Sequence, residues 1–319
     1  MNLIALCVLM SILSVSCIRS QTTAATETTT EAQTTTPPPT LDDFAGCTSI
    51  LKKFGKVENG LYTIVDKVGS VYRTYCDMEI DGGGWTLVAS VHENNIGGKC
   101  SVGDRWSSQQ GNSYAFKDGE QFWSNLDTYG LAESATSDDF KCQGYFNLPA
   151  RDVMIWHVPD GTMLKDYSEK AFLKYHTNSG FLERYGWNLY HLFKYYFPMR
   201  QGQADDESGP AEMIVWDKGD NETMVANTAP SMVSETVPGF IQFRAMNHES
   251  SAFALCPGVK LEKSRGNAEH ACVGSVGYTR ESYHQCGDFA GFDWNGKGTK
   301  YGFSTSKEML ESAIFIFYR

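Results

Sequence analysis

The stretch Cys76-Asp-Met-Glu-Ile-Asp-Gly-Gly-Gly-Trp-Thr-Leu-Val88 decides how the globular part of this chain begins to fold. Its three successive glycines predict a sharp turn, because glycine adopts backbone conformations that other residues avoid. Before the turn, VYRTYCDM (71–78) alternates apolar and polar side chains, which predicts a strand. After it, WTLVASV (85–91) predicts another strand, and the indole of Trp85 is most simply delivered to the core.

Length and composition indicate a globular protein. The chain has 319 residues, enough for one large domain or two modest ones, and 41% of them are hydrophobic. The net charge is −11 and no basic patch is visible, which argues against nucleic acid or an anionic membrane as a partner. The acidity suits cation binding but does not establish it, since many secreted proteins are acidic.

The N-terminal residues predict two segments that precede the globular domain at 41–319. Residues 1–20 contain the apolar run LIALCVLMSILSVS, typical of a secretory signal peptide; a signal anchor is the alternative, but the run is short for a membrane span. Residues 21–40 are rich in threonine with a proline cluster, which predicts a disordered stalk, either O-glycosylated or a plain flexible linker. We therefore expect a secreted protein without membrane insertion.

Cysteine usage also fits an oxidising compartment. Of nine cysteines, Cys7 and Cys17 fall in or beside the signal peptide. The odd number that remains leaves at least one cysteine unpaired or intermolecular, and the absence of a CxxC pair argues against a zinc knuckle. The remaining cysteines are Cys47, Cys76, Cys100, Cys142, Cys256, Cys272 and Cys286.

Two glycine-containing stretches, 92–104 and 266–303, gather carboxylate, amide and carbonyl oxygens. Such hard donors on a winding backbone suit calcium rather than zinc. The alternative for each stretch is a polar surface loop with ordinary solvated acids.

The part between these stretches has a mixed pattern. Apolar residues at helical spacing predict helices at Ser168–Tyr175 and Trp187–Phe197, whereas MIVWD (213–217) and GFIQFRAM (239–246) predict strands. Asn221, in Asn-Glu-Thr, is a candidate N-glycosylation site.

No enzyme motif is visible: the chain lacks GxSxG, HExxH and a P-loop. Asp138 and Asp139 could serve as acid and base, but adjacent acids are common on surfaces. His157, His176 and His191 have no evident serine or cysteine partner. We expect no enzyme, with a hydrolase as the alternative because glycosidase carboxylates leave little local signature.

Several motifs, in one order, resemble a known family. CDMEIDGGGWTLV is similar to the motif of fibrinogen-related domains, and the following ASVHENNIGGKCSVGDRWSSQQG resembles the intelectins, or X-type lectins. The resemblance continues through ATSDDFK, IWHVP, PGFIQFR, GNAEHACVG, QCGDFAGFDW and FYR, from about Cys47 to Arg319. It implies an α+β fold in which a fibrinogen-like segment, about 41–90, merges into a large, loop-rich lectin domain with short strands and few helices.

The resemblance implies a calcium-dependent lectin of innate immunity. In intelectins a surface Ca2+ is chelated by the exocyclic vicinal diol of microbial sugars such as galactofuranose, because calcium accepts many oxygen ligands at flexible angles. The residues at matching metal positions are His92, Glu93, Asn95, Gly98, Gly103, Asp104, Asp139, Asn267, Glu269, His270, Glu281 and Asp288. The residues at matching carbohydrate positions are Asn267, Glu269, His270, Glu281, Trp294 and Phe303.

Two of these positions depart from the family pattern. Asn95 stands where relatives carry an aspartate, so this donor brings less charge to the metal. Phe303 stands where relatives carry a tyrosine, which keeps an apolar wall around the diol but removes a hydroxyl. Trp294 would form the other wall; core packing is the alternative for this residue.

The resemblance also implies a disulfide pattern, Cys47–Cys76, Cys100–Cys286 and Cys256–Cys272, which leaves Cys142 over. The N-terminal cysteines that cross-link subunits in some relatives are missing, so any homo-oligomer would be non-covalent. The alternative function is a non-lectin interaction or matrix protein on a fibrinogen-like scaffold, in which calcium is structural only.

Overall fold

The structure is a computed structural model. The chain divides into two units, Met1–Pro38 and Pro39–Arg319. All residues that can be described belong to the second unit; they are 46–92, 106, 123–198, 209–228, 233–246, 252–262, 272–273 and 312–319.

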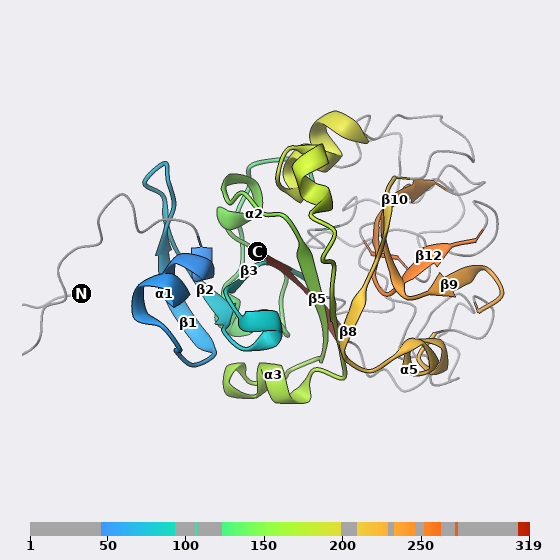
Figure 1. The fold of residues 1–319 in the computed structure, drawn as a ribbon, viewed down its shortest axis with the longest axis horizontal. Coiled ribbons are helices and arrows are strands. Elements are labelled where there is room, and N and C mark those ends of the chain that lie inside the picture. The colour runs from blue at the N-terminus through green and yellow to red at the C-terminus, as the bar shows by residue number, and fades with distance from the viewer. Residues whose placement is uncertain are drawn as a thin grey trace, which may run out of the picture. The chain divides into compact units, whose positions relative to one another are not determined.

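A large antiparallel sheet organises the second unit (Figure 1). Its strands follow the order β1-β2-β3-β13-β5-β6-β8, and β4 pairs with β3 beside this path. The strands are β1 (Gly60–Val65), β2 (Val71–Asp77), β3 (Trp85–Val91), β4 (Phe140–Lys141), β5 (Val153–Pro159), β6 (Leu173–His176), β8 (Val215–Lys218) and β13 (Ser312–Tyr318).

The last strand, β13, lies in the middle of this sheet. Ile314 pairs with Val91 of β3 on one side and with His157 of β5 on the other. Every residue of β3 and β13 is buried, so both faces of the sheet are covered here. Because both pairings are antiparallel, β13 begins at the end of the sheet where β3 and β5 finish.

The glycine turn connects β2 to β3 through the short 3-10 turn η2 (Ile80–Gly82). Asp81 and the three glycines that follow it all have positive φ, which makes the reversal tight. The indole of Trp85 is fully buried, and its Nε1 donates to the carbonyl of Ile80 at 3.0 Å. The predicted turn, its two flanking strands and the burial of Trp85 are confirmed.

Aromatic side chains fill both sides of the central strands. On one face Trp156 packs against Phe317 with ring centroids 4.7 Å apart, and Tyr75 lies 6.0 Å from Trp156. Successive residues of a strand point to opposite faces, so Tyr318 lies on the other side, where it stacks with Tyr145 at 6.2 Å. Rings of this size supply much of the apolar area that stabilises the sheet.

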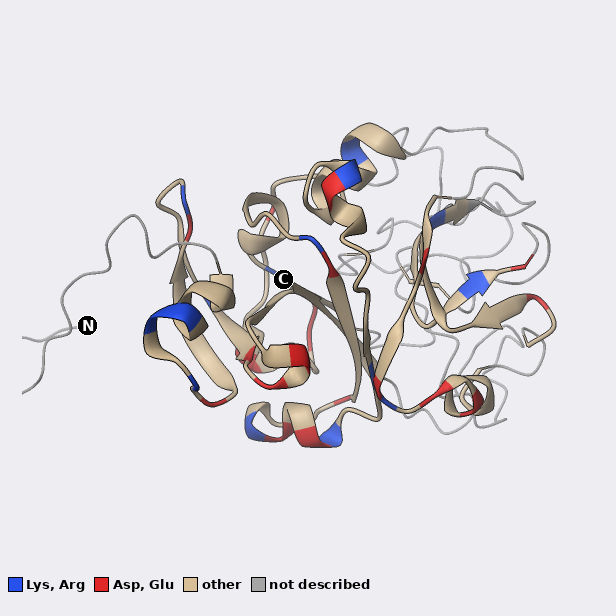
Figure 2. Ribbon diagram, viewed as in Figure 1, with Lys and Arg blue, Asp and Glu red and all other residues tan. Residues whose placement is uncertain are grey.

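The described helices are short. Helices α1 and α2 contact β3, and α3 contacts β5. Lys52 and Lys53 lie in the last turn of α1, where the helix dipole favours positive charge (Figure 2). No helix in the described ranges combines the length and apolarity needed to cross a membrane. The helices and turns are α1 (Gly46–Phe54), η4 (Ala132–Ser134), α2 (Gly144–Asn147), η5 (Leu164–Asp166), α3 (Tyr167–Lys170), η6 (Phe181–Tyr185), α4 (Leu189–His191), the π-helical turn η7 (Leu192–Tyr196) and α5 (Asn221–Ala226).

Two smaller sheets follow the large one in sequence. Leu261 N–H donates to the side chain of Gln242 at 2.8 Å, which links one small sheet to the other. Val273 forms an isolated bridge with Leu255, so the chain returns to the side of β11 after residues 263–271. The strands are β7 (Ala211–Met213), β10 (Phe240–Met246) and β11 (Ala252–Cys256) in one sheet, and β9 (Thr236–Pro238) and β12 (Val259–Leu261) in the other.

The helix predicted at Ser168–Tyr175 is wrong. Helix α3 ends at Lys170, and Leu173–His176 form β6 because they pair with β5 and β8. A short apolar run cannot distinguish a helix from a buried strand, and tertiary pairing decided this one. The other predicted helix, Trp187–Phe197, is confirmed only in part, since it contains α4 and the π-helical turn η7.

Two disulfides are present in the described part, Cys47–Cys76 and Cys256–Cys272, and these are pairs that the family resemblance implied. Cys142 is a free, buried cysteine, as the resemblance also implied. Burial raises the pKa of the Cys142 thiol to about 12, so this thiol stays protonated at neutral pH. The implied pair Cys100–Cys286 lies outside the described residues.

Replacing both Cys47 and Cys76 with alanine should lower the free energy of unfolding by about 3.5 kcal/mol, because their bond closes a loop with a sequence separation of 29. The measurement is urea denaturation of the double variant and the parent protein. Cys142→Ala is the matched control, since it removes a buried thiol without breaking a cross-link, and should cost about 1 kcal/mol. If both variants lose the same free energy of unfolding, the loss comes from packing and not from the cross-link.

Candidate functional site

The structure describes two of the residues predicted to bind metal, His92 and Asp139. The predicted glycosylation site is also described: Asn221 is exposed at the first position of α5, and its Oδ1 accepts a hydrogen bond from Trp216 Nε1 at 3.0 Å. The other predicted residues lie outside the described ranges; they are Glu93, Asn95, Gly98, Gly103, Asp104, Asn267, Glu269, His270, Glu281, Asp288, Trp294 and Phe303.

His92 and Asp139 contact each other, although 47 positions separate them in sequence. The backbone N–H of His92 donates to Asp139 Oδ1 at 2.8 Å. His92 directly follows β3 and Asp139 directly precedes β4, so the pairing of Ser90 with Phe140 sets their positions. Both residues are buried, with exposed fractions of 2% and 4%. The motif that contains His92 and the motif that contains Asp139 were each predicted to supply calcium ligands, and these two residues lie next to each other.

The ring of His92 is held by an acid that sequence reasoning did not single out. His92 Nε2 lies 2.6 Å from Asp160 Oδ1. An ionised carboxylate only accepts hydrogen bonds, so Nε2 carries the hydrogen and donates. Asp160 belongs to the sequence Val-Pro-Asp-Gly (158–161), which signals a turn after a strand but does not reveal what the turn contacts.

The loop that follows β5 is also tied to the loop that precedes β4. Gly161 N–H donates to the carbonyl of Thr136 at 2.9 Å, and Thr136 Oγ1 donates to the carbonyl of Thr162 at 2.6 Å. These bonds fix the loops that carry Asp139 and Asp160 relative to each other. His92 completes the junction because it bonds to both acids.

The beginning of β13 lies at the same end of the sheet. Ser312 pairs with Pro159, the residue before Asp160. Ser312 is the first residue of β13, and the predicted residues Glu281, Asp288, Trp294 and Phe303 precede it in sequence. We call the group of His92, Asp139, Asp160 and Ser312 the His92 end of the sheet.

The chemistry of the His92 end fits a hard cation. The carboxylates of Asp139 and Asp160 are oxygen donors of the kind that calcium prefers. Two buried polar atoms here, His92 Nδ1 and Ser312 Oγ, have no hydrogen-bond partner within the described part of the chain. The described residues alone hold no group of three or more His, Cys, Asp or Glu that could bind a metal. A complete calcium site therefore needs donors from outside the described ranges.

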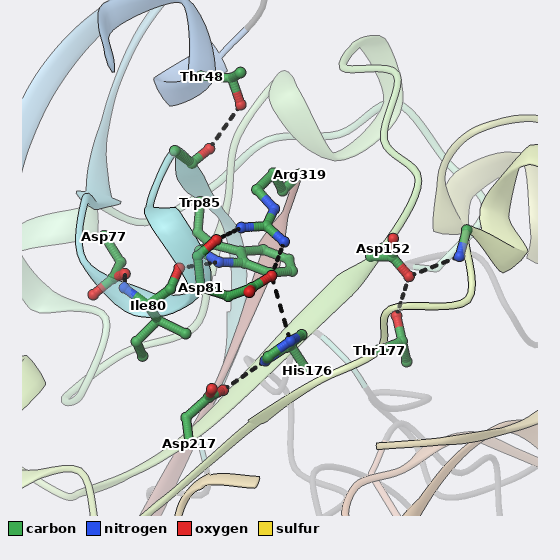
Figure 3. Close-up of polar contacts among 12 residues, drawn as sticks. Thr48, Asp77, Ile80, Asp81, Trp85, Asp152, His176, Thr177, Asp217 and Arg319 are labelled. Atoms are coloured by element: carbon green, nitrogen blue, oxygen red, sulfur yellow. Dashed lines mark hydrogen bonds and ion pairs between the residues drawn. The ribbon is translucent and has the colours of Figure 1, made fainter. Parts of the chain in front are cut away.

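A second polar cluster involves Arg319, which follows β13 (Figure 3). Arg319 forms an ion pair with Asp81, and its guanidinium lies 4.2 Å from the centroid of the Trp85 ring. His176 Nδ1 lies 2.8 Å from Asp217 Oδ2, and its Nε2 lies 3.7 Å from Asp81. The hydrogen bond from Arg319 holds the pKa of Asp81 below its usual value.

This second cluster has a structural explanation. Its ion pairs connect the glycine turn, strands β6 and β8, and the residue that follows β13. Asp81 is half-exposed, so solvent screens its ion pair and the gain in stability is modest. Because His176 pairs with Met154 near the start of β5, this cluster lies at the end of β5 away from Asp160.

Comparison with known proteins finds a similarity for the N-terminal part of this α+β unit. Residues 45–141 match the family model for the C-terminal globular domain of fibrinogen beta and gamma chains. Over 60 residues the chain is 37% identical to the fibrinogen beta chain of Gallus gallus, covering 19% of this chain and 12% of that protein. Residues 45–141 are thus similar to part of the fibrinogen C-terminal domain, and the chain spans only a small share of that relative's length.

The matched residues include the glycine turn and β1 to β4. They also include both His92 and Asp139, and they end before Asp160. The match continues beyond residue 90, where the segment predicted from the motif ended.

Proposed function

We propose that this protein is a secreted calcium-dependent lectin of the intelectin type, which binds exocyclic vicinal diols of microbial glycans. The contact between His92 and Asp139 is the observation that carries the proposal, because it joins two motifs predicted to form one calcium region. The pairing of Ser312 with Pro159 supports it, since β13 begins at the same end of the sheet and the segment with the other predicted ligands precedes β13 in sequence. The proposed function is binding without catalysis, and a homo-oligomer would be non-covalent.

In this proposal the protein's oxygen donors hold calcium, and a bound calcium ion supplies open positions for two adjacent hydroxyl groups. Asp139 provides one carboxylate, and the predicted residues within 93–104 and 267–288 provide the remaining donors. Glu281 accepts a hydrogen bond from a diol hydroxyl, while Trp294 and Phe303 form apolar walls. A flexible acyclic diol enters between such walls more easily than a diol fixed on a ring.

The family match favours a second candidate function. Similarity to a fibrinogen C-terminal domain segment fits an extracellular interaction or matrix protein in which calcium is only structural. In that case calcium would stabilise the fold without creating a sugar site.

The proposal predicts calcium-dependent binding of a galactofuranose-bearing glycan and no binding of its galactopyranose isomer. The full chain is applied to both immobilised glycans, with calcium or with excess chelator. Binding of galactofuranose alone, lost in chelator, supports the diol mechanism. Equal binding of both isomers, or binding that survives chelator, contradicts it. If calcium raises the melting temperature while neither glycan binds, the structural role is favoured.

A further inference from the structure

We infer that Trp216 is the surface on which the first sugar of an N-linked glycan on Asn221 packs. Asn221 and Thr223 complete the acceptor signal Asn-Glu-Thr, at which N-acetylglucosamine is joined to the asparagine amide. The inference concerns what that sugar contacts, and no sequence motif assigned such a role to Trp216. It shares only the secretory route with the proposed function, and it needs no calcium.

The indole of Trp216 fixes the orientation of the Asn221 amide. Trp216 Nε1 lies 3.0 Å from Asn221 Oδ1. An indole N–H only donates, so it faces the amide oxygen, and Nδ2 points away from it. Asn221 is exposed. A Cβ on the neighbouring Gly239 would lie 3.0 Å from Oδ1 and 3.5 Å from Nδ2, so the missing side chain leaves room beside the amide.

Glycan attachment preserves this hydrogen bond and places the sugar beside it. Asn221 Nδ2 bonds to the anomeric carbon of the N-acetylglucosamine at the reducing end of a polyprenyl-diphosphate-linked oligosaccharide. The bond from that carbon to the diphosphate breaks, Nδ2 loses one proton, and polyprenyl diphosphate leaves. The product is a secondary amide, which strongly prefers the trans geometry. In that geometry the anomeric carbon lies on the same side of the amide as Oδ1, and therefore next to Trp216.

Trp216 is held firmly by the large sheet. It pairs with Tyr175 of β6, and the centroids of the two rings are 5.0 Å apart. Tyr175 is fully buried, and its hydroxyl lies 2.6 Å from His157 Nε2. Trp216 itself is half-buried, so part of its ring is accessible. An indole combines a large apolar area with one polar N–H, which suits the apolar face and the polar linkage of a sugar.

The test compares melting temperatures of the full chain, produced in cells that attach N-glycans, before and after an amidase releases the glycan. Release should lower the melting temperature of the parent by about 3 °C, the shift expected for one lost contact of moderate strength in a large domain. Trp216→Phe keeps the acceptor signal but lacks the N–H, so release should lower its melting temperature by less than about 1 °C. The amidase leaves a carboxylate at position 221 in both proteins, so this change is common to them.

Trp187→Phe is the matched control. It replaces another exposed indole, in a residue whose carbonyl accepts from Ala150 N–H. Glycan release should lower its melting temperature as much as that of the parent. Trimming the glycan to its first sugar should change the melting temperature of the parent by less than about 1 °C, because only that sugar reaches the indole.

The three proteins together decide the inference. A loss on release in the parent and in Trp187→Phe, but not in Trp216→Phe, supports it. Equal losses in all three, no loss in the parent, or a loss on trimming overturns it. If Trp216→Phe does not fold, nuclear Overhauser contacts between an indole N–H and the first sugar are measured in the trimmed parent, and their absence overturns the inference.

Mass spectrometry of the secreted parent tests the attachment itself. The peptide that contains Asn221 should carry the mass of an N-glycan, and Asn221→Gln should remove that mass. A parent without a glycan at this position overturns the inference. That result would leave the proposed calcium-dependent lectin untouched, since galactofuranose binding is measured separately.

Discussion

Gly83→Ala should destabilise the protein by about 4 kcal/mol or more, which is a large part of the total stability of a typical domain. Gly83 has φ +76° and ψ −168°, a combination that is essentially restricted to glycine. A Cβ at this position would also lie 2.3 Å from the carbonyl oxygen of Met78. The clashing atom belongs to the backbone of the same tight turn, so it cannot move aside cheaply.

Gly82→Ala is the control for this prediction. Gly82 also has a positive φ, +86°, but a Cβ there would meet no atom within 4 Å. It should therefore cost only backbone strain, about 1 kcal/mol. Urea denaturation of the two variants measures the difference, and equal midpoints would show that the clash with Met78 is relieved.

The glycine turn is the part of the fold that the sequence predicted best. Its geometry is local: three glycines permit positive φ, and alternation on each side indicates strands. The burial of Trp85 follows because the turn leaves its side chain at the start of a central strand. Such features need no knowledge of distant partners.

The position of β13 could not be predicted in this way. Its residues Ser312–Tyr318 form an apolar run that fits any buried strand. Its insertion between β3 and β5 depends on pairings across most of the chain, such as Phe317 with Leu87. The wrong helix prediction at Ser168–Tyr175 has a similar origin, because pairing with β5 and β8 outweighed a helical pattern.

The candidate site was likewise predictable only in part. Residue types and family resemblance selected His92 and Asp139, and the structure brings these two together. Asp160 was missed because a carboxylate in a Pro-Asp-Gly turn is ordinarily a solvated turn residue. Asp160 lies beside the His92 ring only because β3 and β5 run in the same direction on either side of β13 and finish at the same end of the sheet.

On the proposed function, Glu281→Gln should reduce galactofuranose binding by about 100-fold or more and leave the fold intact. Glu281 would bring a negative charge to calcium and accept a hydrogen bond from a diol hydroxyl. A neutral amide does both less well, and the loss of a charged hydrogen bond alone is worth about 1.5–3 kcal/mol. The measurement is calorimetric titration with a soluble galactofuranoside, at calcium concentrations that saturate the parent.

Trp294→Ala and Phe303→Tyr are the companion variants, because they change the walls and not the ligands. Trp294→Ala should weaken sugar binding while the calcium-dependent rise in melting temperature persists. Phe303→Tyr should bind with similar strength, and its added hydroxyl can shift the preference among diol sugars. If Glu281→Gln binds galactofuranoside as the parent does, Glu281 contacts neither the metal nor the diol. The sugar site would then have to be sought elsewhere, and a calcium ion at the His92 end would have a structural role only.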